Sequence, residues 1–478
     1  MLRSKKIAEI TSGLCSTDFN IEAFSIDSRT VKTNEMFIAL RGKNNNGHSF
    51  IKTLNKSQAI LVDELFYSEY PNIIKEFPNT IVVNDCYQAL IDIAKFQRHT
   101  FTGEIIGITG SVGKTTLKSM LVFLLEKMNI PTTYSLGNLN NHYGLPLSLA
   151  NMKDNAFIGI FEMGMSGFHE IEFLSKILNP TVGVITEIAP AHQEFFASLE
   201  EIAQAKSEIC SGINSNNTLF LNYNSPYQEI LTFTANEHNL KVNYVSLQNK
   251  VDSFVEHQEI YFNNINDYGT KVIANVYGQS INFKIKSIAL HNVTLSLFAL
   301  SIIMHICKKL NHSINIQELA DYFNDFNLPQ GRGLITQVVL NNKEVLIIDD
   351  AYNASPKSMQ GSINSLQNIG KNKILVLGDM LELGKFSIEE HLNLASPIIA
   401  CKPKIVIVLG EHMELLANTL KEKNMCDFKI ITCYNVQEIY DNILQHVNNN
   451  DLIFLKGSYG SNIHRVSSLI YENITTEV

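Results

Sequence analysis

Residues 104–120, EIIGITGSVGKTTLKSM, hold the side chains of this sequence that are best suited to phosphate chemistry. An apolar run ends in the glycine-rich turn TGSVGKTT, and residues 114–128 after it have a helix-compatible composition. In this order of strand, loop and helix, backbone N–H groups face a bound phosphate at the start of the helix. The pattern therefore predicts a phosphate-binding loop.

The side chains of this loop have the types that a nucleoside triphosphate requires. Gly110 and Gly113 allow a tight turn with exposed N–H groups, and Lys114 can reach the terminal phosphates. A threonine hydroxyl after the lysine can ligate Mg²⁺. Ile108 stands where the strict G-x-x-x-x-G-K-[ST] pattern has its first glycine, so an ordinary turn with an exposed lysine is the alternative. The order of the residues favours nucleotide binding. The predicted nucleotide-binding residues of the loop are Gly110, Ser111, Val112, Gly113, Lys114, Thr115 and Thr116.

Three further polar residues are candidate metal ligands or catalytic groups. Glu162 follows the apolar run 157–161, and a carboxylate at the tip of a strand beside the phosphate loop is well placed for a metal ion. A capping or surface glutamate is an equal alternative. His192 follows another strand in ITEIAPAH, and Lys206 lies in AQAKSEI on a predicted helix. From spacing alone, a structural histidine and a solvated lysine are the simpler interpretations of these two.

Polar residues also gather in two other places. Three asparagines stand in the loop LGNLNNHYGLP, although loops are commonly polar. Arg332 lies between glycines, where it is accessible and suits a phosphate, with a plain surface role as the default. Asp349 and Asp350 end a predicted strand, and such a pair must face solvent or a ligand. The asparagines are Asn138, Asn140 and Asn141.

The elements that position these residues follow an alternating pattern of strands and helices. Short elements fill residues 1–100, and from residue 104 onward short apolar runs alternate with helix-like segments, as in parallel sheets covered on both faces. Residues 223–290 alternate in hydrophobicity and predict a small antiparallel annex. The predicted strands are 23–27, 35–40, 59–62, 80–83, 157–161, 182–185, 218–221, 344–349, 373–377, 404–409, 428–432 and 451–455. The predicted helices are 87–99, 168–178, 199–213, 292–310, 356–369, 388–400, 413–421 and 436–447.

Composition limits the classes of protein that the chain can belong to. Its 478 residues, 45% hydrophobic and 18% charged, are typical of a globular protein with two to four domains. A net charge of −9 argues against nucleic-acid binding. Seven scattered cysteines without C-x-x-C spacing fit a reducing cytoplasm, and we expect neither a signal peptide nor stable membrane association. The longest apolar stretch, 295–307, is too short to span a bilayer and predicts a buried helix.

Several separated stretches, in the right order over essentially the whole chain, resemble the Mur ligase family of ATP-dependent amide-forming enzymes. These stretches are SIDSRT, FIALRG, TGSVGKTT, NLNNHYGLPLSL, EMG, ITEIAPAH, AKSEI, HN at 291–292, GR at 331–332, DDAYNASPKSM and LGDMLELG. NLNNHYGLP and the last two are most similar to the family member that adds D-alanyl-D-alanine to a UDP-MurNAc-tripeptide. Three features depart from the family pattern. Tyr459 follows K-G-S where arginine is frequent, Gly333 stands where a larger apolar residue is common, and LNYN at 221–224 lacks the acidic residue expected after that strand.

The resemblance implies an α/β fold with a three-domain Mur ligase architecture. The implied domains are an N-terminal UDP-substrate-binding domain (1–100), a central P-loop ATP-binding domain (101–326) and a C-terminal Rossmann-like domain (327–478). Carried over to this chain, nucleotide contacts also come from Asn292, Arg332 and Asp350. Substrate contacts come from Ser28, Arg29, Thr30, His48, Asn138, Asn140, Asn141, Tyr352 and Asn353. Metal ligands are Thr115, Glu162, His192 and a carbamylated Lys206, and the catalytic set is Lys114, Lys206, His192 and Glu162.

The activity implied is formation of a peptide bond through an acyl phosphate in cytoplasmic peptidoglycan precursor synthesis, with ATP and Mg²⁺ as cofactors. Its substrates would be UDP-MurNAc-tripeptide and D-alanyl-D-alanine, and we expect a monomer that closes about its domain junctions. A carbamate on Lys206 would turn an ammonium, which Mg²⁺ repels, into an anion with two hard oxygen donors. A relative that adds a single amino acid is the main alternative. A nucleotide-binding ATPase would use the loop but leave the N-terminal stretches unexplained. A small-molecule kinase would also use the loop, but would release a stable phosphorylated product instead of ADP, phosphate and an amide.

Overall fold

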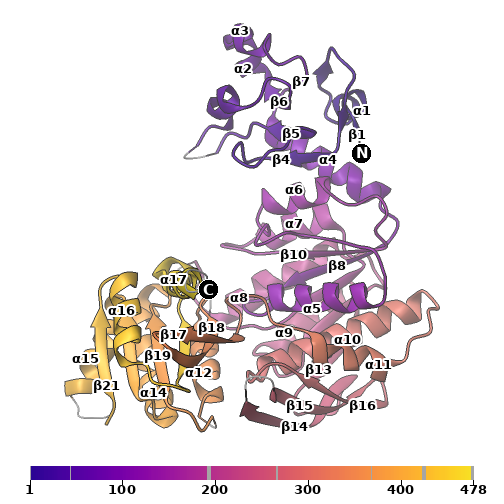
Figure 1. Cartoon of the computed structure of the whole chain (residues 1–478). Helices are drawn as coiled ribbons and strands as arrows, with labels where there is room; N and C mark the ends of the chain where they lie inside the picture. The colour runs from indigo at the N-terminus through magenta and orange to yellow at the C-terminus, as the bar shows by residue number, and fades with distance from the viewer. Residues whose placement is uncertain are drawn as a thin grey trace.

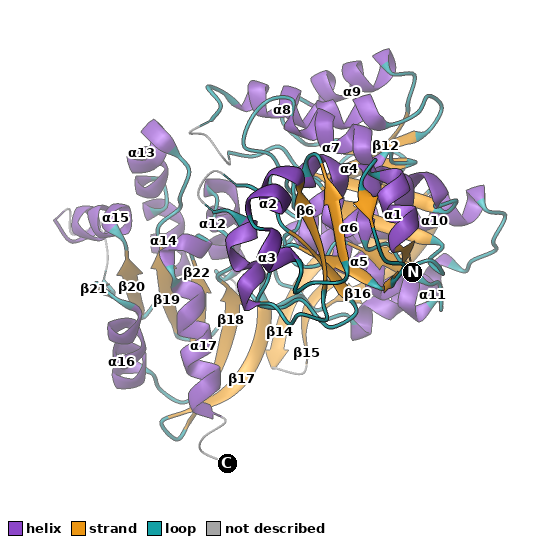
Figure 2. Ribbon diagram, turned by 90° about the horizontal axis from the view of Figure 1, so that it is seen from above, coloured by secondary structure: helices purple, strands orange, loops and turns teal. Residues whose placement is uncertain are grey.

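The computed structural model describes residues 2–42, 45–190, 195–264, 267–367, 369–422 and 427–474. These residues form three large sheets, each covered by helices and each built from one continuous part of the chain, and a two-stranded sheet near the N-terminus. Figure 1 shows the N-terminal unit resting on the central unit, with the C-terminal unit beside the central unit at the lower left. Seen from above, the N-terminal unit again overlies the central one and the C-terminal unit stands to the side (Figure 2).

The N-terminal unit is a small sheet of five strands in the order β2-β7-β6-β5-β4, parallel except for β2. Helix α4 is amphipathic, and its apolar side closes the core of this unit while the helix also packs on α6 and α7 of the central unit. Two hydrogen bonds between the Asn151 side chain and the backbone of Phe24, of 2.8 and 2.9 Å, join the two units. The elements are β1 (Leu2–Arg3), α1 (Ser4–Ile10), β2 (Leu14–Cys15), β3 (Asn20–Ile21), β4 (Ala23–Ser25), β5 (Glu35–Ile38), the 3₁₀ helix η1 (Gly47–Thr53), β6 (Ala59–Asp63), α2 (Glu64–Glu69), α3 (Pro71–Ile74), β7 (Thr80–Val83) and α4 (Cys86–Thr100).

The central unit is a nine-stranded sheet in the order β16-β15-β14-β13-β12-β11-β8-β10-β9. The phosphate-loop strand β8 lies between β10 and β11, so the loop opens where its neighbours end. The elements are β8 (Glu104–Thr109), α5 (Lys114–Lys127), β9 (Thr132–Tyr134), α6 (Gly144–Ala150), β10 (Ile158–Glu162), α7 (Glu170–Leu178), β11 (Val182–Ile185), α8 (Leu199–Ser207), η2 (Glu208–Gly212), β12 (Thr218–Asn222), α9 (Gln228–Glu237), β13 (Lys241–Ser246), β14 (Ser253–Asn264), β15 (Asp267–Val276), β16 (Gln279–Ile285), α10 (His291–Lys309), α11 (Ile316–Asp321) and η3 (Tyr322–Asp325).

The antiparallel annex predicted within residues 223–290 is present, and it is continuous with the central sheet. Strands β14, β15 and β16 do pair antiparallel, but β13 and β14 pair parallel, so the hairpins extend the central sheet instead of forming a sheet of their own. Strand β13 was overlooked because KVNYVS alternates polar and apolar residues at the border of the parallel region.

Helix α10 is the central helix of this unit. Among the described residues it is the one helix that is long and apolar enough to cross a membrane, yet 78% of its most apolar window is buried within the protein. It packs against α5 in the largest apolar core. The buried helix predicted for the stretch 295–307 is confirmed.

The C-terminal unit is a six-stranded sheet in the order β17-β18-β22-β19-β20-β21, with helices on both faces. Strand β17 is an antiparallel edge strand that the sequence reading missed. The predicted helix 388–400 is divided into α13 and α14, because Pro397 is tolerated only in the first turn of a helix. The elements are β17 (Leu334–Leu340), β18 (Lys343–Asp350), α12 (Pro356–Ser365), β19 (Lys373–Gly378), η4 (Gly384–Phe386), α13 (Ser387–Leu392), α14 (Ala395–Cys401), β20 (Ile405–Leu409), α15 (Glu411–Glu422), β21 (Lys429–Cys433), α16 (Val436–His446), β22 (Leu452–Lys456), η5 (Tyr459–Ser461) and α17 (Ile463–Ile474).

Candidate active site

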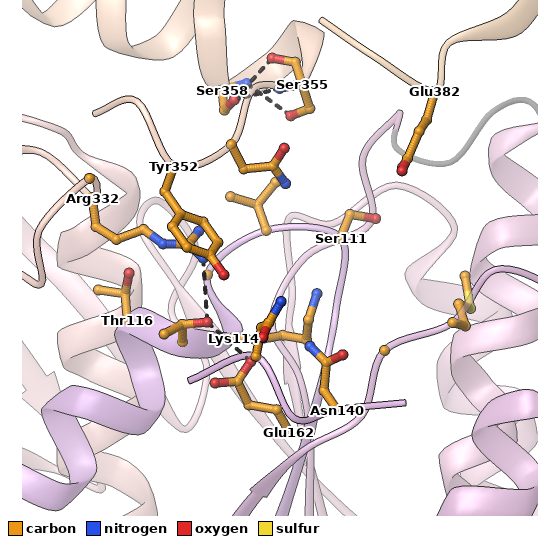
Figure 3. Close-up of a pocket in the computed structure, with 18 of the residues that line it drawn as sticks. Ser111, Lys114, Thr116, Asn140, Glu162, Arg332, Tyr352, Ser355, Ser358 and Glu382 are labelled. Atoms are coloured by element: carbon orange, nitrogen blue, oxygen red, sulfur yellow. Dashed lines mark hydrogen bonds between the residues drawn. The ribbon is translucent and has the colours of Figure 1, made fainter. Parts of the chain in front are cut away.

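A polar cavity of about 530 Å³ lies between the central and C-terminal units. One side is made by the loop between β8 and α5, the asparagine loop and the end of β10. The other side is made mainly by the segment before β17 and the segment between β18 and α12. Figure 3 shows Lys114, Glu162 and Asn140 on one side of this cavity, with Arg332 and Tyr352 reaching in from the other. The predicted nucleotide and substrate residues of two units therefore meet in one place.

The backbone of the phosphate loop has a shape that requires glycine. Gly110 has φ +145°, and a Cβ there would lie 2.0 Å from Thr186 Oγ1. Gly113, with φ +92°, immediately precedes the first residue of α5. Both glycines therefore allow N–H groups to face the cavity where a phosphate would bind.

Lys114 is folded back onto its own loop. Its Nζ donates a 2.5 Å hydrogen bond to the carbonyl oxygen of Gly110. Partial burial lowers the pKa of Lys114 from 10.5 to about 8, against the opposing effect of the Glu162 charge. An ammonium that lacks a full counter-charge is well suited to receive an anionic phosphate.

Glu162 ends β10 at the floor of the cavity and is only 1% exposed. Its Oε2 accepts a 3.1 Å hydrogen bond from Thr115 Oγ1. Its Oε1 forms an ion pair with Lys118 Nζ at 2.7 Å, out of hydrogen-bond alignment, and accepts no hydrogen bond from the described residues. A buried carboxylate beside a hydroxyl is the donor set that Mg²⁺ prefers, so these residues fit the ion.

Lys118 is a candidate functional residue that was not predicted from the sequence. A lysine one turn after Lys114 on a helix is usually solvated, whereas this side chain is only 7% exposed. Its position four residues after Lys114 was the available signal, since residues i and i+4 share a helix face.

Lys206 lies in α8 and is 2% exposed, contrary to the solvated alternative. Burial lowers its pKa well below 10.5, and the charge of Lys114 adds to the effect. Its amine forms no hydrogen bond or ion pair with the described part of the chain. His192, predicted as a ligand with it, lies outside the described residues.

The three asparagines of the loop after β9 all line the cavity. Asn141 Oδ1 accepts hydrogen bonds from the N–H groups of Tyr143 and Gly144, which fixes the start of α6. The backbone carbonyl of Asn140 accepts a 2.8 Å hydrogen bond from Gly164 N, just after Glu162. The asparagine loop is thus attached to the strand that carries the candidate metal ligand.

The C-terminal unit contributes a cation and a carboxylate. Arg332 Nη2 lies 3.4 Å from Thr115 Oγ1 as a donor, and the guanidinium lies 4.1 Å from the centre of the Tyr352 ring. Asp350 Oδ2 accepts hydrogen bonds from Lys456 Nζ, at 2.6 Å, and from Ser362 Oγ, at 2.8 Å. Lys456, in the K-G-S stretch, was not among the predicted residues. Asp350, Tyr352 and Asn353 line the cavity as well.

A second, more apolar cavity of about 430 Å³ adjoins the first. It lies between the phosphate loop, the start of α10 and α12. Four residues line both cavities, namely Val112, Gly113, His291 and Ser358. Asn292, predicted to contact the nucleotide, is 1% exposed and donates a hydrogen bond to Ser287 Oγ at 2.8 Å. It lines neither cavity. The cavity itself has the apolar walls that a nucleobase requires.

The predicted N-terminal substrate residues lie in a different unit from these cavities. Arg29 is exposed and pairs with Asp27 at 2.7 Å, which lowers the Asp27 pKa to about 2. Ser28 and Thr30 flank it at the surface.

His48 is buried inside the N-terminal unit. It is 2% exposed, its Nδ1 lies 3.0 Å from Asn46 Oδ1, and its Nε2 accepts a hydrogen bond from Asp63 N at 3.3 Å. Both ring nitrogens are engaged inside the unit, and the substrate contact of His48 stays a prediction.

Comparison with known proteins gives matches along the whole chain. Residues 108–303 match the Mur ligase middle domain and residues 336–459 match the Mur ligase glutamate ligase domain. The UDP-N-acetylmuramoyl-tripeptide–D-alanyl-D-alanine ligase of Rickettsia prowazekii is 32% identical, over 98% of this chain and 99% of that protein. The ligase of the same name from Bacillus subtilis is 29% identical over 98% of both.

Solved structures with the same fold include MurF from Acinetobacter baumannii, with a TM-score of 0.81, 23% identity and 98% coverage of both chains. MurF ligase from Thermotoga maritima, solved in complex with ADP, has a TM-score of 0.77 and 25% identity over 96% of this chain and 99% of that one.

Proposed function

Because the chain belongs to the Mur ligase family, we propose that it joins D-alanyl-D-alanine to UDP-MurNAc-tripeptide and converts ATP to ADP and phosphate in the same reaction. The observation that carries the proposal is the shared cavity, in which a phosphate loop, a buried carboxylate and an arginine from the next unit converge. Ligases named for this reaction match the chain almost from end to end.

Two cations of this chain suit the first step, in which the terminal carboxylate of the tripeptide attacks the γ-phosphate. Both reactants are anionic, so the site must neutralise charge and hold the attack in line. Lys114, released from Gly110, would bind the β- and γ-phosphates, and Arg332 would close over them from the C-terminal unit. Thr115 and Glu162 would hold Mg²⁺, which supplies further neutralisation when bound.

In the second step the amine of the dipeptide attacks the acyl phosphate, a peptide bond forms and phosphate leaves. Acyl phosphates hydrolyse, so the site must exclude water while the intermediate exists. The base of the nucleotide fits the apolar cavity beside the phosphate loop. The asparagine loop and Tyr352 are the parts of the cavity wall placed to meet the peptide.

Closure of the units is a consequence of this proposal. The exposed segment 28–30, which we assign to the uridine diphosphate, lies on the N-terminal unit, away from the C-terminal unit (Figure 1). ATP together with the UDP-substrate should therefore reduce the radius of gyration measured by small-angle scattering. An unchanged radius with both bound would contradict closure.

Lys206 is the proposed site of a carbamate that, with Glu162 and His192, binds a second Mg²⁺. Support comes from its burial and from a lowered pKa, which leaves more of the amine neutral and able to react with CO₂. Lys206→Ala should lose most activity and regain part of it with added short carboxylates. Full activity of the variant without them would refute this role.

The substrate assignment is tested by a competition experiment. The protein is given ATP, Mg²⁺, UDP-MurNAc-tripeptide and an equimolar mixture of D-alanyl-D-alanine with single amino acids, and the products are weighed by mass spectrometry. We expect the mass of a UDP-MurNAc-pentapeptide. Incorporation of one amino acid would instead indicate a different member of the family. The proposed setting is the cytoplasm, with the protein acting as a monomer.

A further inference from the structure

The buried Lys118 joins three parts of the active site that are far apart in the sequence. It lies on α5, one turn after Lys114, and its Nζ donates to the carbonyl oxygens of Ser135 at 2.7 Å and Gly137 at 3.1 Å. The same ammonium pairs with Glu162 Oε1 at 2.7 Å. Lys118 does not line the cavity, whereas Glu162 does.

We propose that Lys118 is a positioning residue, which holds Glu162 by one oxygen so that the other faces the metal site. Glu162 Oε2 lies beside Thr115 Oγ1, 3.1 Å away, on the cavity side of the carboxylate. Figure 3 shows the Glu162 side chain at the base of the cavity, close to Lys114. The inference rests on the proposed function in one respect, namely that Thr115 and Glu162 bind the divalent ion.

The geometry leaves Glu162 with few other restraints. Its Oε1 is buried and receives no hydrogen bond within the described part of the chain. The polar partner of this oxygen among the described residues is therefore the Lys118 ammonium, through the ion pair. An uncompensated buried carboxylate is costly and turns toward any available donor. Partners of this kind, which orient a metal ligand, commonly change metal affinity 10- to 100-fold when they are removed.

The same ammonium fixes the beginning of the asparagine loop. Ser135 and Gly137 lie within three residues before Asn138 in the sequence, and Gly137 has φ +52°. Ser135 Oγ also accepts a 3.3 Å hydrogen bond from Glu162 N, so loop and strand are bonded to each other as well as to Lys118. One side chain therefore sets both the carboxylate that faces the metal and the loop that faces the peptide.

The test compares Lys118→Met with the natural protein by titrating Mn²⁺ in the presence of ADP and following free Mn²⁺ by electron paramagnetic resonance. Mn²⁺ serves as the probe because it takes the same oxygen ligands as Mg²⁺. We expect Mn²⁺ to bind 10- to 100-fold more weakly, while calorimetry without metal gives ADP affinity within twofold of the natural protein.

Three controls separate positioning from folding. Lys127→Met changes an exposed lysine of the same helix and should leave both affinities unchanged. Lys118→Gln keeps a donor for the two carbonyl oxygens without the charge, so it tests the ion pair if the methionine variant does not fold. Lys118→Arg restores the charge and should recover part of the Mn²⁺ affinity.

The outcomes are distinct. Unchanged Mn²⁺ affinity in a folded variant, whatever its melting temperature, would overturn the inference and leave Lys118 a structural residue. Tighter Mn²⁺ binding would also overturn it, since Lys118 would then be a competitor of the ion for Glu162. Failure of the natural protein to bind Mn²⁺ with ADP would refute the proposed metal site itself, and the inference with it.

Discussion

Replacing Lys114 with methionine is expected to stabilise the free protein while it abolishes turnover. The pKa of Lys114 is lowered from 10.5 to about 8. At pH 7 the side chain is charged in both states, and the folded protein binds this proton more weakly than the unfolded chain does, so the charge lowers the free energy of unfolding. A difference of roughly 2.5 pKa units corresponds to about 3.4 kcal/mol, and solvent access to this half-buried side chain makes that an upper limit. Methionine removes the charge and keeps a similar length.

The variant also loses one favourable contact. The hydrogen bond to the Gly110 carbonyl, made by a charged donor, is worth about 1.5–3 kcal/mol. The net gain in the free energy of unfolding at pH 7 is therefore on the order of 1 kcal/mol, or about 2–4 °C in melting temperature. The penalty of the native lysine is fully present below pH 8 and fades as pH rises from about 8 to 10.5. At pH 9.5 about 1.4 kcal/mol of this penalty remains. Since that no longer exceeds the value of the hydrogen bond that the variant loses, the stability advantage of methionine should vanish.

The assay is thermal unfolding of the natural protein, Lys114→Met and Lys127→Met at pH 7 and at pH 9.5, without nucleotide. Lys127 is exposed and pairs with Asp325 at the surface, so its substitution should change stability little and equally at both pH values. A lower melting temperature for Lys114→Met at pH 7, or an advantage that does not shrink at pH 9.5, would refute the reasoning.

Three other changes test separate parts of the site. Gly110→Ala places a Cβ 2.0 Å from Thr186 Oγ1 at φ +145°, so ADP affinity measured by calorimetry should fall more than about 100-fold, and a change below threefold would contradict the role of the loop. Arg332→Ala removes the cation that contacts Thr115 from the C-terminal unit; kcat should fall roughly 10²- to 10³-fold in a phosphate-release assay, and an unaltered kcat would exclude Arg332 from the reaction. Chelation with EDTA should stop turnover reversibly, with activity restored by Mg²⁺ or Mn²⁺; activity that persists in EDTA would argue against a metal at Glu162.

Much of the fold was predictable because its strands are short, continuous apolar runs. β7 and β11 match the predicted residues, and β8 leads into the phosphate loop as expected. Elements with mixed composition were missed, among them the edge strand β17, whose LITQVVL alternates because one face is exposed. The division between α13 and α14 depends on Pro397, which the periodicity of the predicted helix concealed.

The site was predicted less completely, because burial of a polar side chain is decided by tertiary contacts. Lys118 and Lys206 both resemble solvated lysines of amphipathic helices in the sequence, yet both are buried beside the phosphate loop. His48 was predicted only as a substrate contact, and its burial, with its ring 4.8 Å from that of Phe66 inside the N-terminal unit, was not predicted. Loops and helices far apart in the sequence supply these surroundings, so spacing along the chain does not record them.

Release of phosphate from ATP, measured with UDP-MurNAc-tripeptide in the presence and absence of D-alanyl-D-alanine, tests the central claim most directly. The proposed function predicts steady release that requires both the tripeptide and the dipeptide, with one phosphate for each peptide bond formed. Equal release without any amine would contradict a ligase and leave an ATPase. Release that depends on a single amino acid, and not on the dipeptide, would retain the active site described here and contradict the substrate assigned to it.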